Sequence, residues 1–360
     1  MLAFVILWLL VIFWRSRPVP KSERFYSDYM DPARTTAIKG VFILLIFLTH
    51  SEQYLTLSDT LPDQIYAIIR LGFGQSVVTA FFFYSGYGLM ESLRRKGEPY
   101  LRAFPKARIF KTLLHFDLAV LLYLILDFVL DIPLTTGEII GSLIGWESVG
   151  NSAWFIFDIL VAYVMFYVCF RAFPEQTQWK KGALLFTVCS VVFVILMILF
   201  RESRYYNTFL CVSMGIWFSQ YRPQIERFVQ QRFLPLLLGL AALYVGGGVL
   251  LMRVYDDYEY LYIPLPMLFL TVLIMVTMVW RFDNPVLQYF GSHLFSVFIL
   301  MRLPMTVLEY YGVTDHVGLF IAVSFAVTVP LAHVFDAALK KLDPALHLDR
   351  PRGAEESNQK

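Results

Sequence analysis

Apolar runs long enough to cross a lipid bilayer as helices recur along the whole of this chain. Of its 360 residues, 58% are apolar or aromatic and only 16% are charged, whereas an ordinary soluble domain carries roughly 25% charge. This composition excludes a soluble enzyme, a disordered regulator and a nucleic-acid binder. We therefore expect an all-α, polytopic membrane protein, a helical bundle whose first partner is the lipid bilayer.

The first apolar run, Leu2 to Trp14, differs from a cleaved secretory signal because its basic residues follow the apolar stretch. We expect it to be retained as an extra N-terminal transmembrane helix. Ten core transmembrane helices are expected after it, with the approximate bounds 37–50, 65–90, 109–130, 153–171, 182–200, 205–219, 233–252, 260–280, 286–310 and 316–339.

Lysine and arginine are shared unevenly between alternate connections of these spans. One set holds only Arg201, Arg204 and Arg253. The other set is rich in both residues and comprises 15–34, 94–111, 171–181, 222–232, Arg281 and a tail with Lys340, Lys341, Arg350 and Arg352. Because cytosolic loops carry the excess of basic residues, we expect the rich set and the C-terminus in the cytosol and the N-terminus outside.

The predicted organisation is one membrane domain. Residues 1–33 are expected to form the extra helix and a cytosolic linker, residues 34–342 the ten-helix domain, and residues 343–360 a short cytosolic tail. The three cysteines lie inside apolar runs without paired spacing, so we expect packing residues and neither a disulfide framework nor a metal site.

Ionisable residues inside apolar spans are functional candidates, because a charge in hydrocarbon costs several kcal/mol unless it faces protein or water. Those expected deepest are Lys39, His50, Asp158, His293 and Arg302. Lys39 and His50 are separated by eleven steps of 100°, about three turns, so both point to one side of a helix about 16 Å apart. They either line a shielded passage, or Lys39 reaches cytosolic headgroups and His50 caps the outer end.

Four stretches, in order, resemble the acyltransferase 3 family of integral membrane acyltransferases. Residues 37–41 with His50 resemble its pattern of an arginine, ten residues and a histidine. Residues 78–88 resemble its aromatic Ser-Gly-Phe motif, 152–156 its Trp-Tyr/Phe-Leu helix start, and 287–298 its late Leu-Gly-x-x-Ser-Tyr motif. The likeness extends from residue 35 to about 340 and implies the family's ten-helix membrane fold.

The chain departs from the family pattern at five positions. Lys39 replaces the usual arginine, which keeps the charge and loses the planar fork. Thr36 replaces a frequent acidic residue, Lys111 a second arginine, Leu294 a serine and Met301 a histidine. These differences indicate a divergent branch, and they bear on the acceptor more than on the acyl chemistry.

The resemblance implies transfer of an acyl group, commonly acetyl, from cytosolic acyl-CoA to a hydroxyl of an acceptor. That acceptor is often a cell-envelope saccharide or lipid-linked precursor reached from outside a bacterial cell membrane. Such a transfer needs a base near neutral pH, so His50 is expected either to take the proton or to carry the acyl group. Lys39 is expected to hold the donor or stabilise the oxyanion.

A phosphate-bearing donor needs a cationic cytosolic entrance. Arg102, Lys106, Arg108 and Lys111 are the candidates, Arg108 first among them, although juxtamembrane basic residues also set topology and bind anionic lipid. Ser85, followed by Gly86 and Gly88, allows close approach of a narrow ligand chain, although glycine also serves helix packing.

Three residues are candidates for acceptor binding. Trp154, a helical turn before Asp158, suits sugar stacking beside a carboxylate, or anchors the helix at the headgroups. Arg302 precedes a helix-breaking proline and is expected to pair with Asp158 or meet an anionic acceptor. His293 is expected to be a helix–helix hydrogen bonder.

A transporter or flippase for a polar envelope precursor is the alternative function, because it too is polytopic and built around buried charges. Transporters often consist of two matching halves with broken helices, and the sequence shows no such internal symmetry. A signalling or scaffold protein would not need Lys39 and His50 on one face.

Overall fold

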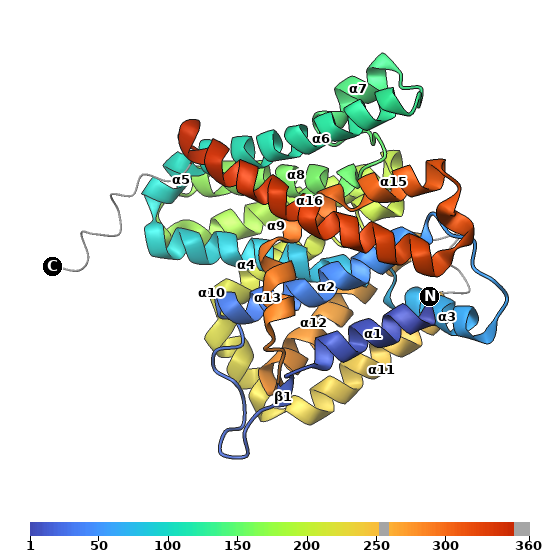
Figure 1. Ribbon diagram of the computed structural model, residues 1–360. Helices are drawn as coiled ribbons and strands as arrows, with labels where there is room; N and C mark the ends of the chain where they lie inside the picture. Colours follow the sequence, from blue (N-terminus) through green and yellow to red (C-terminus); the bar gives the residue numbers. More distant parts are fainter. Residues whose placement is uncertain (252–258, 349–360) are drawn as a thin grey trace.

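The computed structural model describes residues 1–251 and 259–348 and is built almost entirely of helices, which confirms the predicted all-α fold (Figure 1). The α-helices are α1 (Leu2–Phe13), α2 (Pro32–Glu52), α3 (Leu61–Phe73), α4 (Thr79–Lys96), α5 (Glu98–Phe104), α6 (Lys111–Val129), α7 (Thr136–Ser142), α8 (Ala153–Ala172), α9 (Trp179–Phe200), α10 (Leu210–Gln231), α11 (Phe233–Leu251), α12 (Pro264–Val279), α13 (Pro285–Ser292), α14 (Leu294–Leu300), α15 (Arg302–Tyr310) and α16 (Val317–Ala345).

Short helical turns and one strand pair complete the fold. The turns are η1 (Gly74–Val78), the π-helical η2 (Pro105–Phe110), η3 (Gln176–Gln178), η4 (Ser203–Tyr205), η5 (Glu259–Tyr262) and η6 (Val313–Asp315). β1 (Arg17–Pro18) pairs antiparallel with β2 (Trp280–Arg281), with Arg17 opposite Arg281. Arg253, Arg350 and Arg352 of the charge pattern lie outside the described residues, as does the predicted tail beyond Leu348.

Within 1–251 and 259–348, seven helices are long and apolar enough to cross a membrane, or up to nine if each of two bent pairs is one span. α10 occupies the place of the expected span 205–219, but it continues into polar sequence and kinks at Tyr221, two residues before Pro223. α1 is also helical, as expected, but only 12 residues long. The number of ten core spans therefore stays a prediction.

Two spans, each expected as one continuous helix, are broken in the structure. The span expected at 65–90 bends by 65° between α3 and α4, where Gly74 adopts φ +46°, a left-handed conformation that favours glycine. The span expected at 286–310 bends by 68° at His293, which lies between α13 and α14. Broken helices at membrane depth occur where protein or a wet cavity satisfies the freed backbone groups.

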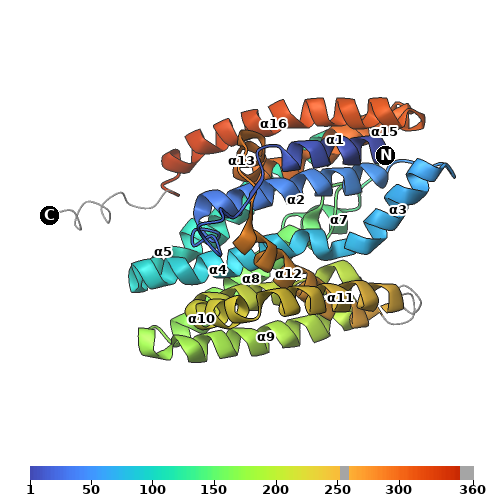
Figure 2. The ribbon, with the colours of Figure 1, turned by 90° about the horizontal axis from the view of Figure 1, so that it is seen from below.

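The helices form stacked layers. In Figure 2, α1 and α16 lie on one side of the bundle, α9, α10 and α11 lie on the other, and α2, α4 and α8 run between them. The central helices bury a dense core that includes Ile43, Phe47, Phe82 and Phe166. The middle of the bundle is therefore where a site shielded from lipid can lie.

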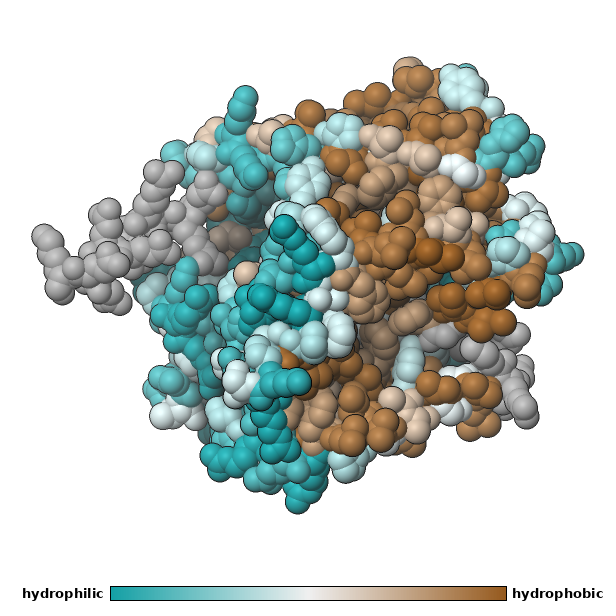
Figure 3. Space-filling view, turned by 60° about the horizontal axis from the view of Figure 1, so that its bottom comes forward, coloured by the Kyte–Doolittle hydropathy of each residue, from teal (hydrophilic) through white to brown (hydrophobic). Residues whose placement is uncertain are grey.

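The outer surface of the bundle suits hydrocarbon. α11 buries no residue of its own, and Leu199 and Leu238 are exposed by 67% and 60%. Polar side chains instead gather at the end of the molecule where α16 finishes, beside a broad apolar surface (Figure 3). This division between an apolar body and a polar end identifies a membrane protein.

Two helix pairs in the core approach each other so closely that only glycine fits at the contact. A side-chain carbon at Gly40 of α2 would lie 2.0 Å from the carbonyl oxygen of Leu287, and one at Gly291 of α13 would lie 1.9 Å from that of Thr36. Gly86 of α4 and Gly215 of α10 make the equivalent contacts in their pair, each at 2.1 Å from a carbonyl oxygen. Small residues of this kind let membrane helices pack backbone to backbone.

Replacing Gly291 by alanine should force α13 away from α2 and destabilise the protein by about 1–3 kcal/mol, the usual cost of overpacking. Gly239→Ala is the matched control, because Gly239 lies in α11 with nothing within 4 Å of the added carbon. Thermal unfolding in detergent should show a lower Tm for Gly291→Ala alone. Equal melting of the two variants would contradict the close contact.

Candidate active site

A cavity of about 540 Å³ lies between α2, α4, α8 and α10 at the polar end of the bundle. Three residues of the predicted donor site, Lys39, Ser85 and Arg108, line it together with Tyr84, Gly88 and Tyr163. These residues come from α2, α4, η2 and α8, so the fold brings together side chains that are far apart in the sequence. The cavity is therefore the first candidate for ligand binding.

Individual buried polar atoms of the residues that line this cavity lack a hydrogen-bond partner among the described residues. The Lys39 ammonium lies 5.9 Å from the centre of the Tyr84 ring. The hydroxyl of Tyr84 and the Nε of Arg108 are both buried, and neither has a hydrogen-bond partner among the described residues. Because buried polar atoms are nearly always hydrogen-bonded, such atoms beside a cavity indicate a site for water or a polar ligand.

The charge of the cavity wall is mixed but mainly positive. Arg95 and Arg222 also line it, as do the carboxylates of Asp31 and Glu91. Glu91 is already engaged, because it accepts a hydrogen bond from Ser219 at 2.6 Å. Lys39 and Arg108 are left as the cations nearest the membrane interior, which suits an anionic ligand entering from the polar end.

The other three basic residues predicted for the donor lie elsewhere. Among the described residues of the 102–111 segment, only Arg108 lines the cavity. Arg102 is exposed and pairs with Glu98 at 2.9 Å, and Lys106 is exposed. Lys111 pairs with Asp343 at 2.5 Å. Their roles in donor binding stay predictions. Their positions outside the cavity fit the alternative, in which basic residues set topology or bind anionic lipid.

The glycines near Ser85 divide between the two roles that the sequence left open. Gly86 serves helix packing, because it contacts the backbone of Val212 in α10. Gly88 lines the cavity, and a side-chain carbon there would meet nothing within 4 Å. Close approach of a ligand is therefore possible at Gly88 and prevented at Gly86.

His50 lies at the opposite end of α2, in a polar group of its own. Its Nδ1 is 3.2 Å from a guanidinium nitrogen of Arg302, and its Nε2 is 3.4 Å from the hydroxyl of Ser152, the residue that precedes α8. Arg302 also donates to Gln53 at 2.9 Å and to Tyr54 at 3.1 Å. The imidazole is thus held between two elements that are distant in the sequence.

This arrangement fixes the tautomer of the ring. A guanidinium can only donate hydrogen bonds, so Nδ1 of His50 must accept the one from Arg302. The proton of the neutral ring then lies on Nε2, which faces Ser152. Arg302 therefore orients His50, and the pairing with Asp158 that the sequence left open is not formed: Arg302 bonds to His50, Gln53 and Tyr54.

Trp154 and Asp158 lie on α8, two and six residues after Ser152. Asp158 is fully buried, and neither of its carboxylate oxygens has a hydrogen-bond partner among the described residues. An uncompensated buried carboxylate is costly and calls for a proton, water or a ligand group beside it. Trp154 is half-buried and packs edge-on against Phe155 at 5.9 Å. Contact of either residue with a sugar stays a prediction.

α8 connects the two ends of the site. Ser152 contacts His50 at one end, and Tyr163, eleven residues later, lines the cavity beside Lys39. Lys39 and His50 are also eleven residues apart, on an antiparallel helix. Lys39 shares its cavity with Tyr163, and His50 contacts Ser152, so both side chains lie on the side of α2 that faces the interior of the bundle, as the helical spacing predicted.

Three residues at the site, Ser152, Tyr163 and Tyr84, were not predicted from the sequence as site residues. A serine before a helix is an ordinary helix cap, and tyrosines are common in apolar spans. The one available signal is the eleven-residue spacing of Ser152 and Tyr163, which equals that of Lys39 and His50 and could have indicated these two residues. His293 lies at the helix break, where its Nδ1 is 2.9 Å from the carbonyl of Tyr289, four residues earlier. Its expected helix–helix hydrogen bond stays a prediction.

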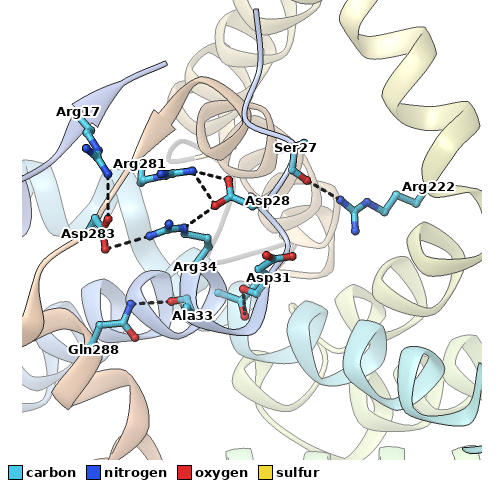
Figure 4. Close-up of polar contacts among 11 residues, drawn as sticks. Arg17, Ser27, Asp28, Asp31, Ala33, Arg34, Arg222, Arg281, Asp283 and Gln288 are labelled. Atoms are coloured by element: carbon cyan, nitrogen blue, oxygen red, sulfur yellow. Dashed lines mark hydrogen bonds and ion pairs between the residues drawn. The ribbon is translucent and has the colours of Figure 1, made fainter. Parts of the chain in front are cut away.

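The linker before α2 closes one side of the cavity. Met30, Asp31 and Pro32 belong to its wall. Figure 4 shows how the preceding turn is fixed: both carboxylate oxygens of Asp28 accept from Arg281, at 2.6 and 2.7 Å, and one also accepts from Arg34 at 3.0 Å. The position of this wall therefore depends on an ionic contact with β2.

A family model described as an acyltransferase domain matches residues 33–335 of the chain. No curated protein and no solved structure matches. The matched range includes Lys39, His50, Arg108, Ser152 and Arg302, whereas Met30, Asp31 and Pro32 of the cavity wall precede it.

Burial opposes ionisation of Asp28, but the hydrogen bonds from Arg34 and Arg281 outweigh it and lower the pKa of the carboxyl. The stabilisation it provides should therefore be complete above the ordinary carboxyl pKa of about 4 and disappear as pH falls through the lowered value. Tm measured from pH 6 to pH 3 should show wild type above Asp28→Asn at pH 6, with the gap shrinking in acid. A gap that stays constant would contradict the ion pairs.

Proposed function

This chain belongs to the acyltransferase family whose domain model it matches over residues 33–335, and we propose that it moves an acyl group, most simply acetyl, from cytosolic acyl-CoA to a hydroxyl of an acceptor reached from the other side of the membrane. The protein is a membrane acyltransferase. A cell-envelope saccharide or a lipid-linked precursor is the proposed acceptor, and a bacterial cell membrane is the proposed location.

The proposal rests mainly on one observation: the site consists of two polar groups, one at each end of α2. Lys39 faces a cavity at the polar end of the bundle, and His50 faces Ser152 and Arg302 at the other end. About 16 Å of helix separates them, which is comparable to the reach of the extended pantetheine arm of CoA. One donor molecule could thus be held at the polar end while its thioester approaches His50.

The donor would be held by its phosphates at Arg108 and Lys39. A guanidinium bonds phosphate oxygens in pairs, and Lys39 supplies a second positive charge in a protected site. This placement makes the basic end cytosolic, in agreement with the excess of lysine and arginine in its connections. The N-terminus would then be outside.

The chemical step follows from the position of His50. The acceptor oxygen attacks the acyl carbonyl while its proton passes to the imidazole; the carbon–sulfur bond then breaks, and the imidazolium returns the proton to the CoA thiolate. Nδ1 becomes available when Arg302 turns from the ring toward the oxyanion or the acceptor. Transient acylation of His50 is the second route, with the same bonds broken and formed in two stages.

His50→Ala should lower acyl transfer at least about 100-fold, since a positioned general base contributes that much or more. Label passing from radiolabelled acetyl-CoA to the membrane fraction of the expression host measures it. His316→Ala is the control, because His316 is exposed at the start of α16. Undiminished transfer by a correctly inserted His50→Ala protein would refute the role of this residue.

Lys39→Arg should retain more transfer than Lys39→Ala, because the positive charge is the feature shared with the family pattern. The difference should appear mainly in KM for acetyl-CoA, measured as CoA release, if Lys39 holds the donor. Lys340→Ala, an exposed lysine at the polar end, serves as the control for general loss of charge. Equal losses in Lys39→Arg and Lys39→Ala would show that charge is not what the site needs.

A further inference from the structure

A layer of phenylalanine rings lies between the donor cavity and His50. We call Phe82, Phe155 and Phe298 the phenylalanine layer. The ring of Phe155 is at its centre, 4.9 Å from that of Phe82 and 5.2 Å from that of Phe298. Phe298 in turn packs edge-on against the imidazole of His50 at 6.1 Å.

The three rings come from three helices, α4, α8 and α14, and meet at Phe155. Phe155 is one helical turn inward from Ser152 on α8, and Phe298 is about one turn inward from Arg302. Phe82 is on the His50 side of Tyr84, the α4 residue that lines the donor cavity. The ring contacts run without a gap from Phe82 to the imidazole, so an acyl group that moves from the cavity toward His50 would meet these rings.

The packing of the layer leaves one ring with free space beside it. Phe82 and Phe298 are buried, with 0% and 3% exposure. Phe155 is half-buried, although it touches both of them and also Trp154 and Phe81. Phe155 is thus the least enclosed of the three rings. Phe155 is therefore the member best able to yield to a ligand.

We propose that the phenylalanine layer, and Phe155 above all, determines the length of acyl chain that the protein accepts. This inference rests on the function proposed above. A short acyl group would pass beside the Phe155 ring to His50, and a longer chain would overlap with the rings of Phe82 and Phe298. The same apolar barrier keeps water from the cavity side away from the reacting thioester.

The inference concerns specificity, so its test compares acyl-CoA molecules instead of absolute rates. CoA release by purified protein is measured with acetyl-CoA, butyryl-CoA and octanoyl-CoA, for wild type, Phe155→Ala and Phe155→Leu. Wild type should prefer acetyl-CoA. Removing the ring should raise the octanoyl-to-acetyl ratio of kcat/KM at least about tenfold, since a single methylene in a tight pocket is worth about 10- to 200-fold.

Phe166→Ala is the matched control. Phe166 is equally a phenylalanine of α8 and fully buried, but it packs against Phe104 and Phe170, away from His50. Its loss should reduce stability without changing the chain-length ratio. Phe155→Leu keeps most of the packing volume, so it decides the question if Phe155→Ala does not fold.

A second measurement separates this inference from the proposed function. Bound ligand raises Tm by mass action, so the Tm increase given by each acyl-CoA reports binding without an acceptor. A larger increase with octanoyl-CoA for Phe155→Leu than for wild type supports the layer as the length determinant. Parallel profiles in wild type and both Phe155 variants would overturn it, whereas a wild-type protein that neither binds nor cleaves any acyl-CoA would overturn the proposed function itself.

Discussion

The high cost of leaving a charge in hydrocarbon shapes the interior of this protein. Lys39 and Arg108 belong to helical segments long and apolar enough to cross a membrane, and Arg302 belongs to one of the bent helix pairs. Each of the three faces another helix, a cavity or a polar partner. Satisfying them requires several helices to meet around each charge. The cavity at one end and the group around His50 at the other are two solutions to the same requirement, placed along one pair of antiparallel helices.

Backbone-to-backbone packing keeps these two groups in position. Gly40 and Gly291 bring α2 against α13, and Gly86 and Gly215 bring α4 against α10. α2 carries Lys39 and His50, and α4 carries Tyr84 and Ser85, so two of the helices that line the cavity each belong to a glycine-packed pair. Contacts of this kind leave little freedom for the helices to shift, and the adaptable parts of the site are side chains such as Phe155.

The sequence predicted well what depends on periodicity and composition. Helices form at the apolar runs, and Lys39 and His50 lie on one helix, α2, with both side chains toward the interior, as their eleven-residue spacing predicts. It could not predict what depends on neighbours distant in the chain. Arg302 bonds to His50 and not to Asp158, and α3 bends away from α4 at Gly74, because tertiary contacts and a local left-handed turn decide these features.

The family likeness begins at residue 33, yet the donor cavity takes part of its wall from Met30, Asp31 and Pro32. These residues are held by Asp28 from one side, and the strand before them is paired with β2. The family domain therefore begins later in the chain than the residues that form the cavity. A chimaera joined at residue 33 would keep Lys39, His50 and Arg302 and still have a changed wall on one side of the cavity.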